Sequence, residues 1–270
     1  QSDDKGRMLA LLNGLPFRKR LAIINDNGKG LSRARNIGWR NARGDVIAFT
    51  DDDAFVDKKW VEGILQSFSL QKFKIGITGG KIIPVFDEMN PDWRMPERWE
   101  YLYPAYDRGD HIGEYTNGEL PPGASFAILR SLLEKTGGFN ERLGVIEGKK
   151  TQIYGEDSEV ALQVQKLGYQ VVYNSNIIVY HPVPLSRQNQ DFLNRRLYIE
   201  GITQMYVYLI MNRPVFRKRI YFLYDSLKRL LALILSGRKR LDRREYLGMK
   251  STIKGRIYTI LMKGILGIEI

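Results

Sequence analysis

The sequence predicts an α/β fold with a mostly parallel central sheet, followed by a C-terminal helical extension. Between residues 21 and 83, apolar runs of strand length alternate with segments that have helical periodicity, which is typical of strand–helix–strand units. The last third instead shows long helical patterns rich in Lys and Arg. We therefore expect a sheet-based domain over residues 1–186 and basic amphipathic helices over residues 187–270.

The predicted elements of the first domain succeed one another closely. A short helix is expected over residues 6–15 and a strand over 21–24. Ser32 is a good N-cap residue for the next helix, because its hydroxyl can accept a free backbone N–H of the first turn. An apolar strand over 46–50 comes next. The helix after it places five apolar residues on one face: Trp60, Val61, Ile64, Leu65 and Phe68.

A further strand is expected over residues 75–83, and the chain then becomes irregular. Six prolines and a group of aromatic residues interrupt any regular pattern over residues 84–123. A structureless segment of this length is uncommon unless it is functional. Its aromatic side chains suit a sugar or apolar acceptor, or they pack the segment down; they are Trp93, Trp99, Tyr101, Tyr103 and Tyr106.

Acidic residues open the next predicted helix. After a strand over 123–129, Glu156, Asp157 and Glu159 stand in the first turn of a helix that ends at Gly168. Acids at this position are favoured by the helix dipole, yet a carboxylate fixed there can also act as a catalytic base. Strands over 170–173 and 177–180 then lead to His181, which is either structural or a metal ligand.

Three consecutive carboxylates, Asp51, Asp52 and Asp53, come directly after the strand over 46–50. Adjacent acids repel one another unless water or a cation neutralises them. In parallel sheets, ligands sit at the carboxyl ends of strands, and oxygen ligands suit Mg²⁺ or Mn²⁺. The triplet is therefore either a divalent-metal site or an acidic loop before a helix that Asp57 caps.

The charge distribution points to an anionic partner. Residues 187–270 hold 18 Lys and Arg against 6 Asp and Glu, whereas residues 1–186 hold 24 of each sign. The whole net charge of +12 therefore lies in the last third, which favours a lipid or nucleic-acid surface. The chain has no cysteine and two histidines, so disulfides are excluded and zinc chemistry is disfavoured.

Two helices are expected in this basic third, over residues 191–211 and 215–235. Neither provides the roughly 18 uncharged apolar residues that a membrane span requires. The second combines an apolar stripe with Lys and Arg, which suits a helix lying in the plane of a membrane surface. Packing against the first domain, with a solvated basic face, is the alternative.

An ordered series of short motifs runs through residues 1–182. It consists of residues 30–38, residues 44–53, Pro122-Gly123-Ala124-Ser125-Phe126, Gly137-Gly138-Phe139, Gly155-Glu156-Asp157 and Gly168-Tyr169. This series resembles the family-2 inverting glycosyltransferases of the GT-A fold. The resemblance implies a nucleotide-diphosphate sugar as donor and Mn²⁺ or Mg²⁺ as cofactor.

The resemblance also implies roles for individual acids. The acidic triplet corresponds to the family's DxD motif, with Asp51 near the donor ribose and Asp53 binding the metal; Asp52 belongs to the motif without a task of its own. Asp157, in the Glu156-Asp157 pair, matches the general base that deprotonates the acceptor hydroxyl. His181 falls where several GT-A enzymes place a further metal ligand.

The helix over residues 32–42 carries the remaining expected contacts. Arg33, Arg35 and Asn36 match a motif that lies beside the nucleotide, with Arg35 the better candidate for a donor contact. The family usually opens with a strand, a helix and a second strand, and residues 1–4 resemble the stretch just after that second strand. We therefore expect the sequence to be a fragment of a longer protein, with Asp3 or Asp4 near the nucleotide.

These features lead to one main hypothesis and two alternatives. The main hypothesis is a metal-dependent inverting glycosyltransferase with a lipid-linked or envelope-glycan acceptor, cytoplasmic and peripheral on the inner face of a membrane. A sugar-phosphate nucleotidyltransferase would normally show a Gly-rich phosphate loop at its N-terminus, which is not seen. A nucleic-acid-binding protein would explain the basic third but leave the acidic motifs unexplained.

Overall fold

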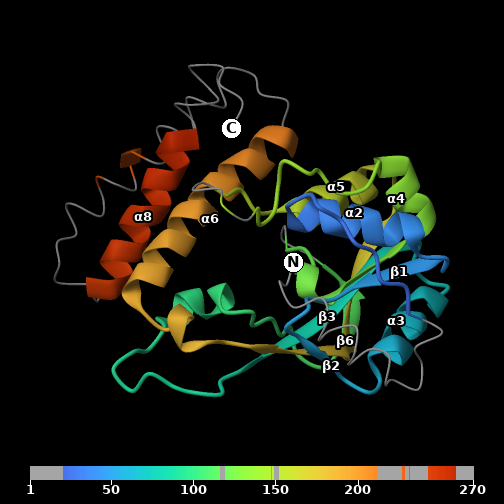
Figure 1. The fold of residues 1–270 in the computed structure, drawn as a ribbon, viewed down its shortest axis with the longest axis horizontal. Helices are drawn as coiled ribbons and strands as arrows, with labels where there is room; N and C mark the ends of the chain where they lie inside the picture. The colour runs from blue at the N-terminus through green and yellow to red at the C-terminus, as the bar shows by residue number, and fades with distance from the viewer. Residues whose placement is uncertain are drawn as a thin grey trace.

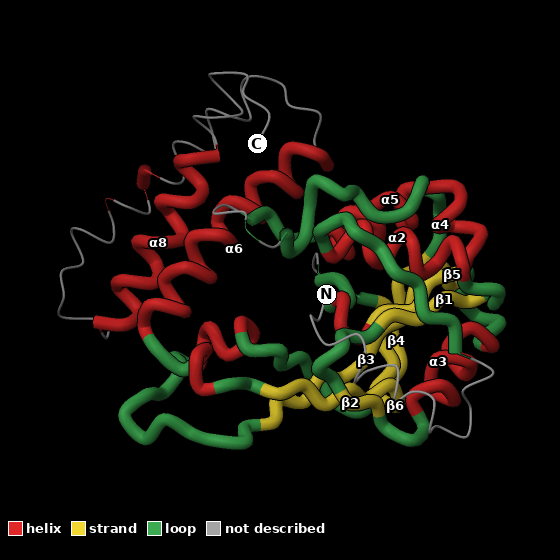
Figure 2. Tube along the Cα trace, viewed as in Figure 1, coloured by secondary structure: helices red, strands yellow, loops and turns green. Residues whose placement is uncertain are grey.

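The computed structural model describes residues 21–115, 119–146, 148, 152–211, 227–228, 231 and 243–259. A six-stranded sheet forms the centre of this part of the chain, with helices on both faces (Figure 1). Helices α2, α4 and α5 cover one face and α3 covers the other, while α6 and α8 stand together beside the sheet (Figure 2).

The strand order in the sheet is β1-β5-β3-β6-β2, and β4 also pairs with β6. The strands are β1 (Val46–Phe49), β2 (Phe55–Val56), β3 (Ile75–Val85), β4 (Ile112–Glu114), β5 (Phe126–Leu129) and β6 (Gln170–Pro182). The predicted strands over 170–173 and 177–180 are one strand, β6, whose register shifts opposite Gly79 and Lys81 of β3.

The expectation of a mostly parallel sheet is wrong for the described strands. β3 pairs with β6 in parallel, but β1–β5, β3–β5, β2–β6 and β4–β6 are antiparallel. β1, β3 and β6 do run in one direction, as the strand–helix–strand pattern predicts. β5 then enters between β1 and β3 from the opposite direction, after the long irregular segment, and local sequence pattern carries no information on that insertion.

The face covered by α2 (Leu31–Asn41), α4 (Arg130–Thr136) and α5 (Glu156–Lys166) holds the main core. Trp39, Leu132 and Val164 from these helices pack with Ile128 and Tyr173 from the sheet. Ser32 does not act as the N-cap: Gly30 is the N-cap of α2, and the Ser32 hydroxyl donates to the Leu143 carbonyl at 2.7 Å. This bond ties the start of α2 to the loop before α5.

Helix α3 (Trp60–Ser69) buries only part of the predicted face: Trp60, Ile64 and Phe68 pack in one cluster, but Val61 and Leu65 do not. Val61 and Leu65 are each 59% exposed, whereas Ile64 is 4% exposed. The helix packs through its small residues, because a Cβ added at Gly63 would lie 3.0 Å from the Asn176 backbone in β6. Asp57 is not the N-cap of α3, because Lys59 holds that position; the Asp57 carboxylate accepts the Lys59 N–H at 2.8 Å in the turn before the helix.

The irregular segment contains short 3-10 helices, η2 (Glu97–Leu102) and η3 (Gly123–Ser125), together with β4. Trp99 and Tyr103 are buried in a cluster with Leu193 and Leu197 of helix α6 (Gln190–Met211). Full burial of one such Leu side chain contributes about 1.5–3 kcal/mol. The apolar packing therefore continues across residue 187, where we placed the boundary of the helical extension.

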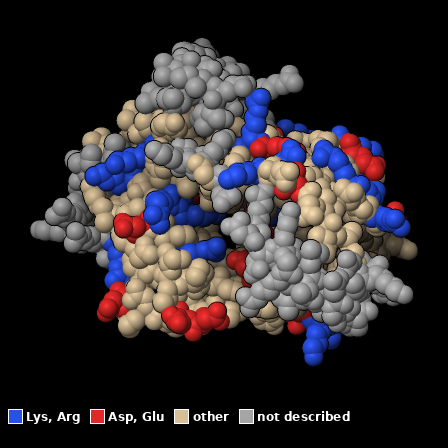
Figure 3. Space-filling model, in the orientation of Figure 1, with Lys and Arg blue, Asp and Glu red and all other residues tan. Residues whose placement is uncertain are grey.

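Helix α8 (Arg243–Thr259) crosses α6 at close range through glycines. A Cβ at Gly201 or Gly255 would collide with the backbone of the opposite helix at Thr252 or Tyr198. After the 3-10 helix η4 (Leu185–Arg187), these two helices form the described part of the extension. On the face shown in Figure 3, Lys and Arg side chains gather over this helix pair.

Other predicted elements are either not formed or fall outside the described residues. Residues 21–24 form no strand, and the predicted helix over 6–15 and most of the one over 215–235 lie outside the described residues. The turn after α5 is as predicted, with Gly168 at φ 79° directly after the helix end. Among the described helices, none has the length and apolar character needed to cross a membrane.

Candidate active site

Two carboxylates and one histidine converge where β1 and β6 end. Asp51 and Asp53 lie just beyond β1, and the Nε2 atom of His181 is 3.4 Å from the Oδ2 of Asp51 and 3.4 Å from the Oδ1 of Asp53. One ligand atom from each residue lies within 4.8 Å of the others. His181 is 5% exposed and Asp53 52% exposed, so the cluster is anchored in the fold and open on one side.

This donor set fits a divalent cation. Two carboxylate oxygens and one imidazole nitrogen suit Mn²⁺, and carboxylates also suit Mg²⁺; both ions leave positions for phosphate oxygens. Burial alone would raise the pKa of Asp51, but the bond to His181 and the charges of Arg35 and Arg187 lower it. The same bond to Asp51 raises the pKa of His181. The lowered pKa keeps the Asp51 carboxylate ionised, so the cluster carries negative charge that a cation can neutralise.

Arg35 links this cluster to the start of α5. Its Nη2 is 3.5 Å from the Oδ1 of Asp51, and its Nη1 donates to the Oε1 of Glu156 at 2.7 Å. The guanidinium is nearly buried and also lies over the Phe139 ring at 5.6 Å. Because an arginine fork can bind two carboxylates at fixed angles, Arg35 holds Asp51 and Glu156 in one arrangement.

Glycine at position 123 makes room for this arrangement. A Cβ there would lie 2.6 Å from the Nη2 of Arg35 and 3.0 Å from the Oδ2 of Asp157. Arg35 and Asp157 therefore approach the same backbone position from two different helices. Any larger residue at position 123 would push one of them away.

Glu156 and Asp157 stand side by side in the first turn of α5 but have different environments. Glu156 is 5% exposed and bonded to Arg35. Burial, together with the neighbouring charge of Asp157, raises the pKa of Glu156 to about 7, against the opposing charge of Arg35. Asp157 is half-buried, and its Oδ1 accepts the Ser158 N–H at 2.7 Å. Of the two, Asp157 is the carboxylate that a substrate can reach.

Three of the predicted donor-contact residues do not join the cluster. Arg33 pairs with Asp26 at 2.7 Å. Asn36 is buried and exchanges two hydrogen bonds with the Phe139 backbone, so its amide holds the Gly138 turn against α2. Asp52 is exposed and makes no hydrogen bond or ion pair with the described residues. Asp51, which we expected near the ribose, instead lies with the candidate metal ligands.

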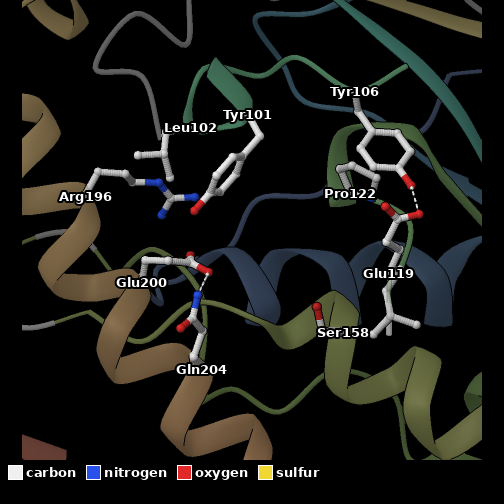
Figure 4. A pocket seen from close by; sticks show the side chains of 10 residues that line it. Tyr101, Leu102, Tyr106, Glu119, Pro122, Ser158, Arg196, Glu200 and Gln204 are labelled. Carbon is white, nitrogen blue, oxygen red and sulfur yellow. Dashed lines mark hydrogen bonds between the residues drawn. The ribbon is translucent and has the colours of Figure 1, made fainter. Parts of the chain in front are cut away.

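A polar pocket of about 490 Å³ opens beside Asp157 (Figure 4). Pro122 and Ser158, which line it, are the chain neighbours of Gly123 and Asp157. Its other walls come from the irregular segment and from α6, through Tyr101, Leu102, Tyr106, Glu119, Leu120, Arg196, Glu200 and Gln204. Of the predicted aromatic residues, Tyr101 and Tyr106 thus face the pocket, while Trp99 and Tyr103 pack the core.

The α6 residues of this pocket were not predicted from the sequence. Arg196, Glu200 and Gln204 recur at every fourth position, which places them on one face of a helix. A stripe of polar residues at helical spacing was the available signal. It was obscured because many other charged residues surround it in the basic third.

Comparison with known proteins gives matches of one kind. Residues 9–137 match the sequence profile described as Glycosyl transferase family 2. A Haloferax volcanii protein, glucosyl-dolichyl phosphate glucuronosyltransferase, is 25% identical over 77% of this chain and 67% of its own length. A Mus musculus protein, inactive polypeptide N-acetylgalactosaminyltransferase-like protein 5, is 26% identical over 67% of this chain and 44% of its own.

The structural comparison concerns the fold. The structure of a Pyrobaculum calidifontis mannosyltransferase in complex with GDP-Man and Mn²⁺ superposes with a TM-score of 0.51 at 14% identity. The match covers 98% of this chain and 63% of that one, so the chain spans less than two thirds of two of these three relatives. This likeness confirms the predicted GT-A fold. The mouse relative is named as inactive, so activity has to be argued from the site itself.

Proposed function

We propose that this chain, whose residues 9–137 match the profile of glycosyl transferase family 2, transfers a sugar from a nucleotide-diphosphate donor to an acceptor, with inversion at the anomeric carbon. The observation that carries this proposal is a continuous series of contacts between charged side chains. It runs from Asp53 through His181, Asp51 and Arg35 to Glu156, which adjoins Asp157. Such a site has a cation-binding end and a carboxylate end, as a sugar transfer from a charged leaving group requires.

The donor diphosphate would lie at the cation-binding end. Asp51, Asp53 and His181 would hold Mn²⁺ or Mg²⁺. The cation would stabilise the negative charge on the diphosphate, which is the leaving group. Arg35 keeps Asp51 ionised and fixed in position through its contact at 3.5 Å. Asp53, the most exposed of the three ligands, faces the side from which the donor enters.

The acceptor would react at the carboxylate end. Asp157 takes the proton from the acceptor hydroxyl while the hydroxyl oxygen forms a bond to the anomeric carbon. The bond from that carbon to the diphosphate oxygen breaks, and its electron pair leaves with the diphosphate. A single displacement of this kind inverts the anomeric centre and needs no protein nucleophile. Glu156 is a positioning residue, because it contacts Arg35 rather than the pocket.

The proposed acceptor is a lipid-linked or envelope glycan at a membrane surface, with the enzyme cytoplasmic and peripheral on the inner face. The excess of Lys and Arg in residues 187–270 supports this, as does the lipid-linked substrate in the Haloferax protein's name. The basic stretch over 213–244, where we expect lipid contact, lies largely outside the described residues.

Liposome sedimentation tests the membrane proposal. We expect the chain to bind vesicles that contain anionic lipid and to lose binding as salt rises, because exposed charges are screened over about 10 Å at 0.1 M salt. A variant with Arg238, Lys239 and Arg240 changed to Gln should bind more weakly. Equal binding to neutral and anionic vesicles would contradict the proposal.

A donor screen tests the transferase itself. UDP-, GDP- and dTDP-sugars are incubated with the chain and Mn²⁺ or Mg²⁺, and nucleotide release is measured with and without EDTA. We expect metal-dependent release from one nucleotide class, and NMR of a transferred product should show the inverted anomer. Release that is insensitive to EDTA would contradict the metal site, and a retained anomer would contradict the single displacement.

A further inference from the structure

The pocket beside Asp157 contains a cation that has no acidic partner among the described residues. Arg196 projects from α6 into this pocket, and its Nη1 atom is buried without a hydrogen-bond partner there. In Figure 4 its guanidinium group extends toward the wall that Tyr101 forms. No ion pair joins Arg196 to any residue in the described part of the chain, although Glu200 stands one helical turn away. A buried donor without a partner is costly, and more so when it is charged.

The acids that line the pocket have other partners. Glu119 pairs with Arg108 at 2.9 Å and accepts the Tyr106 hydroxyl at 3.4 Å. Glu200 accepts the amide of Gln204 at 3.0 Å, and Gln204 in turn binds Arg256 of α8. These contacts hold both carboxylates away from Arg196. They also leave carboxylate oxygens that can accept hydroxyl groups of a sugar.

Arg196 is held in place from behind by an aromatic ring. The carbon of its guanidinium lies 4.0 Å from the centre of the Tyr154 ring, a short cation–π distance. The cation–π attraction to this ring restrains the position of the guanidinium fork. A planar fork that is fixed in this way matches the oxygens of a phosphate or a carboxylate.

We propose that this pocket binds an acceptor that carries an oxyanion, a phosphate or a carboxylate, and that Arg196 recognises it. The inference rests on the proposed transferase function and names the class of its acceptor. The anionic group lies against Arg196, and sugar hydroxyls contact Glu200 and the Tyr101 side of the pocket. The reacting hydroxyl then reaches Asp157, because Ser158 and Pro122 join the pocket to that carboxylate.

Binding of simple probes tests the proposal without requiring turnover. Octyl phosphate, octyl glucuronide and octyl glucoside are titrated against the chain and followed by calorimetry. We expect at least one of the two anionic probes to bind about tenfold or more tightly than the neutral glucoside. Preference for octyl phosphate identifies a phosphate acceptor, and preference for octyl glucuronide identifies a carboxylate. Equal binding of all three probes would overturn the proposal.

Variants of two adjacent arginines locate the effect. Arg196→Gln should lose about tenfold to a hundredfold in affinity for the anionic probe, and Arg196→Lys should recover part of it, since it keeps the charge without the fork. Arg195→Gln is the matched control, because Arg195 is the exposed neighbour on the same helix. An Arg196→Gln variant that binds the anionic probe as tightly as Arg195→Gln would rule out the proposed role.

A second measurement separates this inference from the transferase proposal. Mn²⁺-dependent binding of UDP and GDP is measured for the same variants. We expect Arg196→Gln to bind the preferred nucleotide as the unaltered chain does, because the candidate metal ligands lie at the other end of the site. Loss of probe binding together with nucleotide binding in Arg196→Gln would indicate a structural change and count against recognition by Arg196. Failure of the unaltered chain to bind any nucleotide would instead contradict the transferase.

Discussion

The two ends of the candidate site are built in different ways. The cation-binding end uses residues that lie at the ends of two strands of the sheet, Asp51 and Asp53 after β1 and His181 at the end of β6. The pocket at the other end is assembled from the irregular segment, the start of α5 and one face of α6. The first end is a property of the sheet edge. The second exists only because α6, a helix outside that sheet, packs against the irregular segment and α5.

This difference has a consequence for specificity. Ligands at strand ends keep their positions because the strands are held by backbone hydrogen bonds to their neighbours. A pocket wall that one helix supplies can change its residues without disturbing the sheet. We therefore expect the donor and metal chemistry to depend on Asp51, Asp53 and His181, and acceptor choice to depend on Arg196 and Glu200.

The largest effect is expected at the junction of the two ends. Asp157→Asn removes the base but keeps the shape of the side chain, so transfer should fall by about 10²–10⁴-fold, the usual contribution of general-base catalysis. Donor and Mn²⁺ binding should persist, because Asp157 is not among the candidate ligands. Transfer rates and nucleotide binding are measured for the same preparation.

The control for this variant is Asp191→Asn. Asp191 is an exposed acid in the first turn of α6, so the change has the same effect on charge at a helix start. It should retain transfer. If Asp157→Asn retained transfer as well, another group would have to be the base.

The next effect belongs to the cation-binding end alone. Asp53→Ala removes one of three candidate ligands, so the Mn²⁺ concentration needed for donor binding should rise by about 10–100-fold or more, the loss seen even for outer-shell partners of metals. Metal titrations of donor binding measure this shift. Asp45→Ala, an exposed acid before β1, should leave the titration unchanged. An unaltered titration for Asp53→Ala would exclude Asp53 as a ligand.

The smallest effect concerns Glu156, which contacts Arg35 between the two ends of the site. The pKa of Glu156 in the folded chain is about 7, above the value of 4.5 for an unperturbed Glu, so the folded state binds the proton more tightly. The resulting stability is fully present below about pH 4.5 and is lost as pH rises through about 7.

Glu156→Gln should remove this part of the pH dependence. Urea unfolding of the unaltered chain and the variant at pH 5 and pH 8 measures the difference between the two slopes. Glu134→Gln changes an exposed acid on α4 and should keep the slope of the unaltered chain. Parallel pH profiles for Glu156→Gln and the unaltered chain would show that Glu156 is not the buried titrating group.

Sequence patterns located the elements that carry the acidic residues well and predicted the strand pairing poorly. Short apolar runs followed by acids located β1 and Asp51–Asp53, and the helix signals around Glu156 and Gly168 located α5. The place of β5 between β1 and β3 had no local signal, because strand direction and neighbours depend on the path of the whole chain. The same limit applied to α3, whose buried face depends on the close approach to Asn176 of β6.

The roles of neighbouring residues on α2 show the same division. Arg33, Arg35 and Asn36 belong to one motif and were predicted together. Only the fold shows that Arg35 reaches Asp51 and Glu156, while Asn36 supports the Phe139 turn and Arg33 faces Asp26. Because successive residues on a helix point about 100° apart, adjacent positions reach different surroundings.

Residue order alone was enough to reveal the family resemblance, the acidic motifs and the location of all the excess positive charge. Each of these is a local property that can be read from the order and spacing of residues along the chain. Folding in three dimensions set which acid is buried, which residues of α2 reach the site, and that Arg196 of α6 faces a pocket beside Asp157. Burial and charge pairing arise between segments far apart in the chain, such as Arg35 and Glu156, and no local pattern records them.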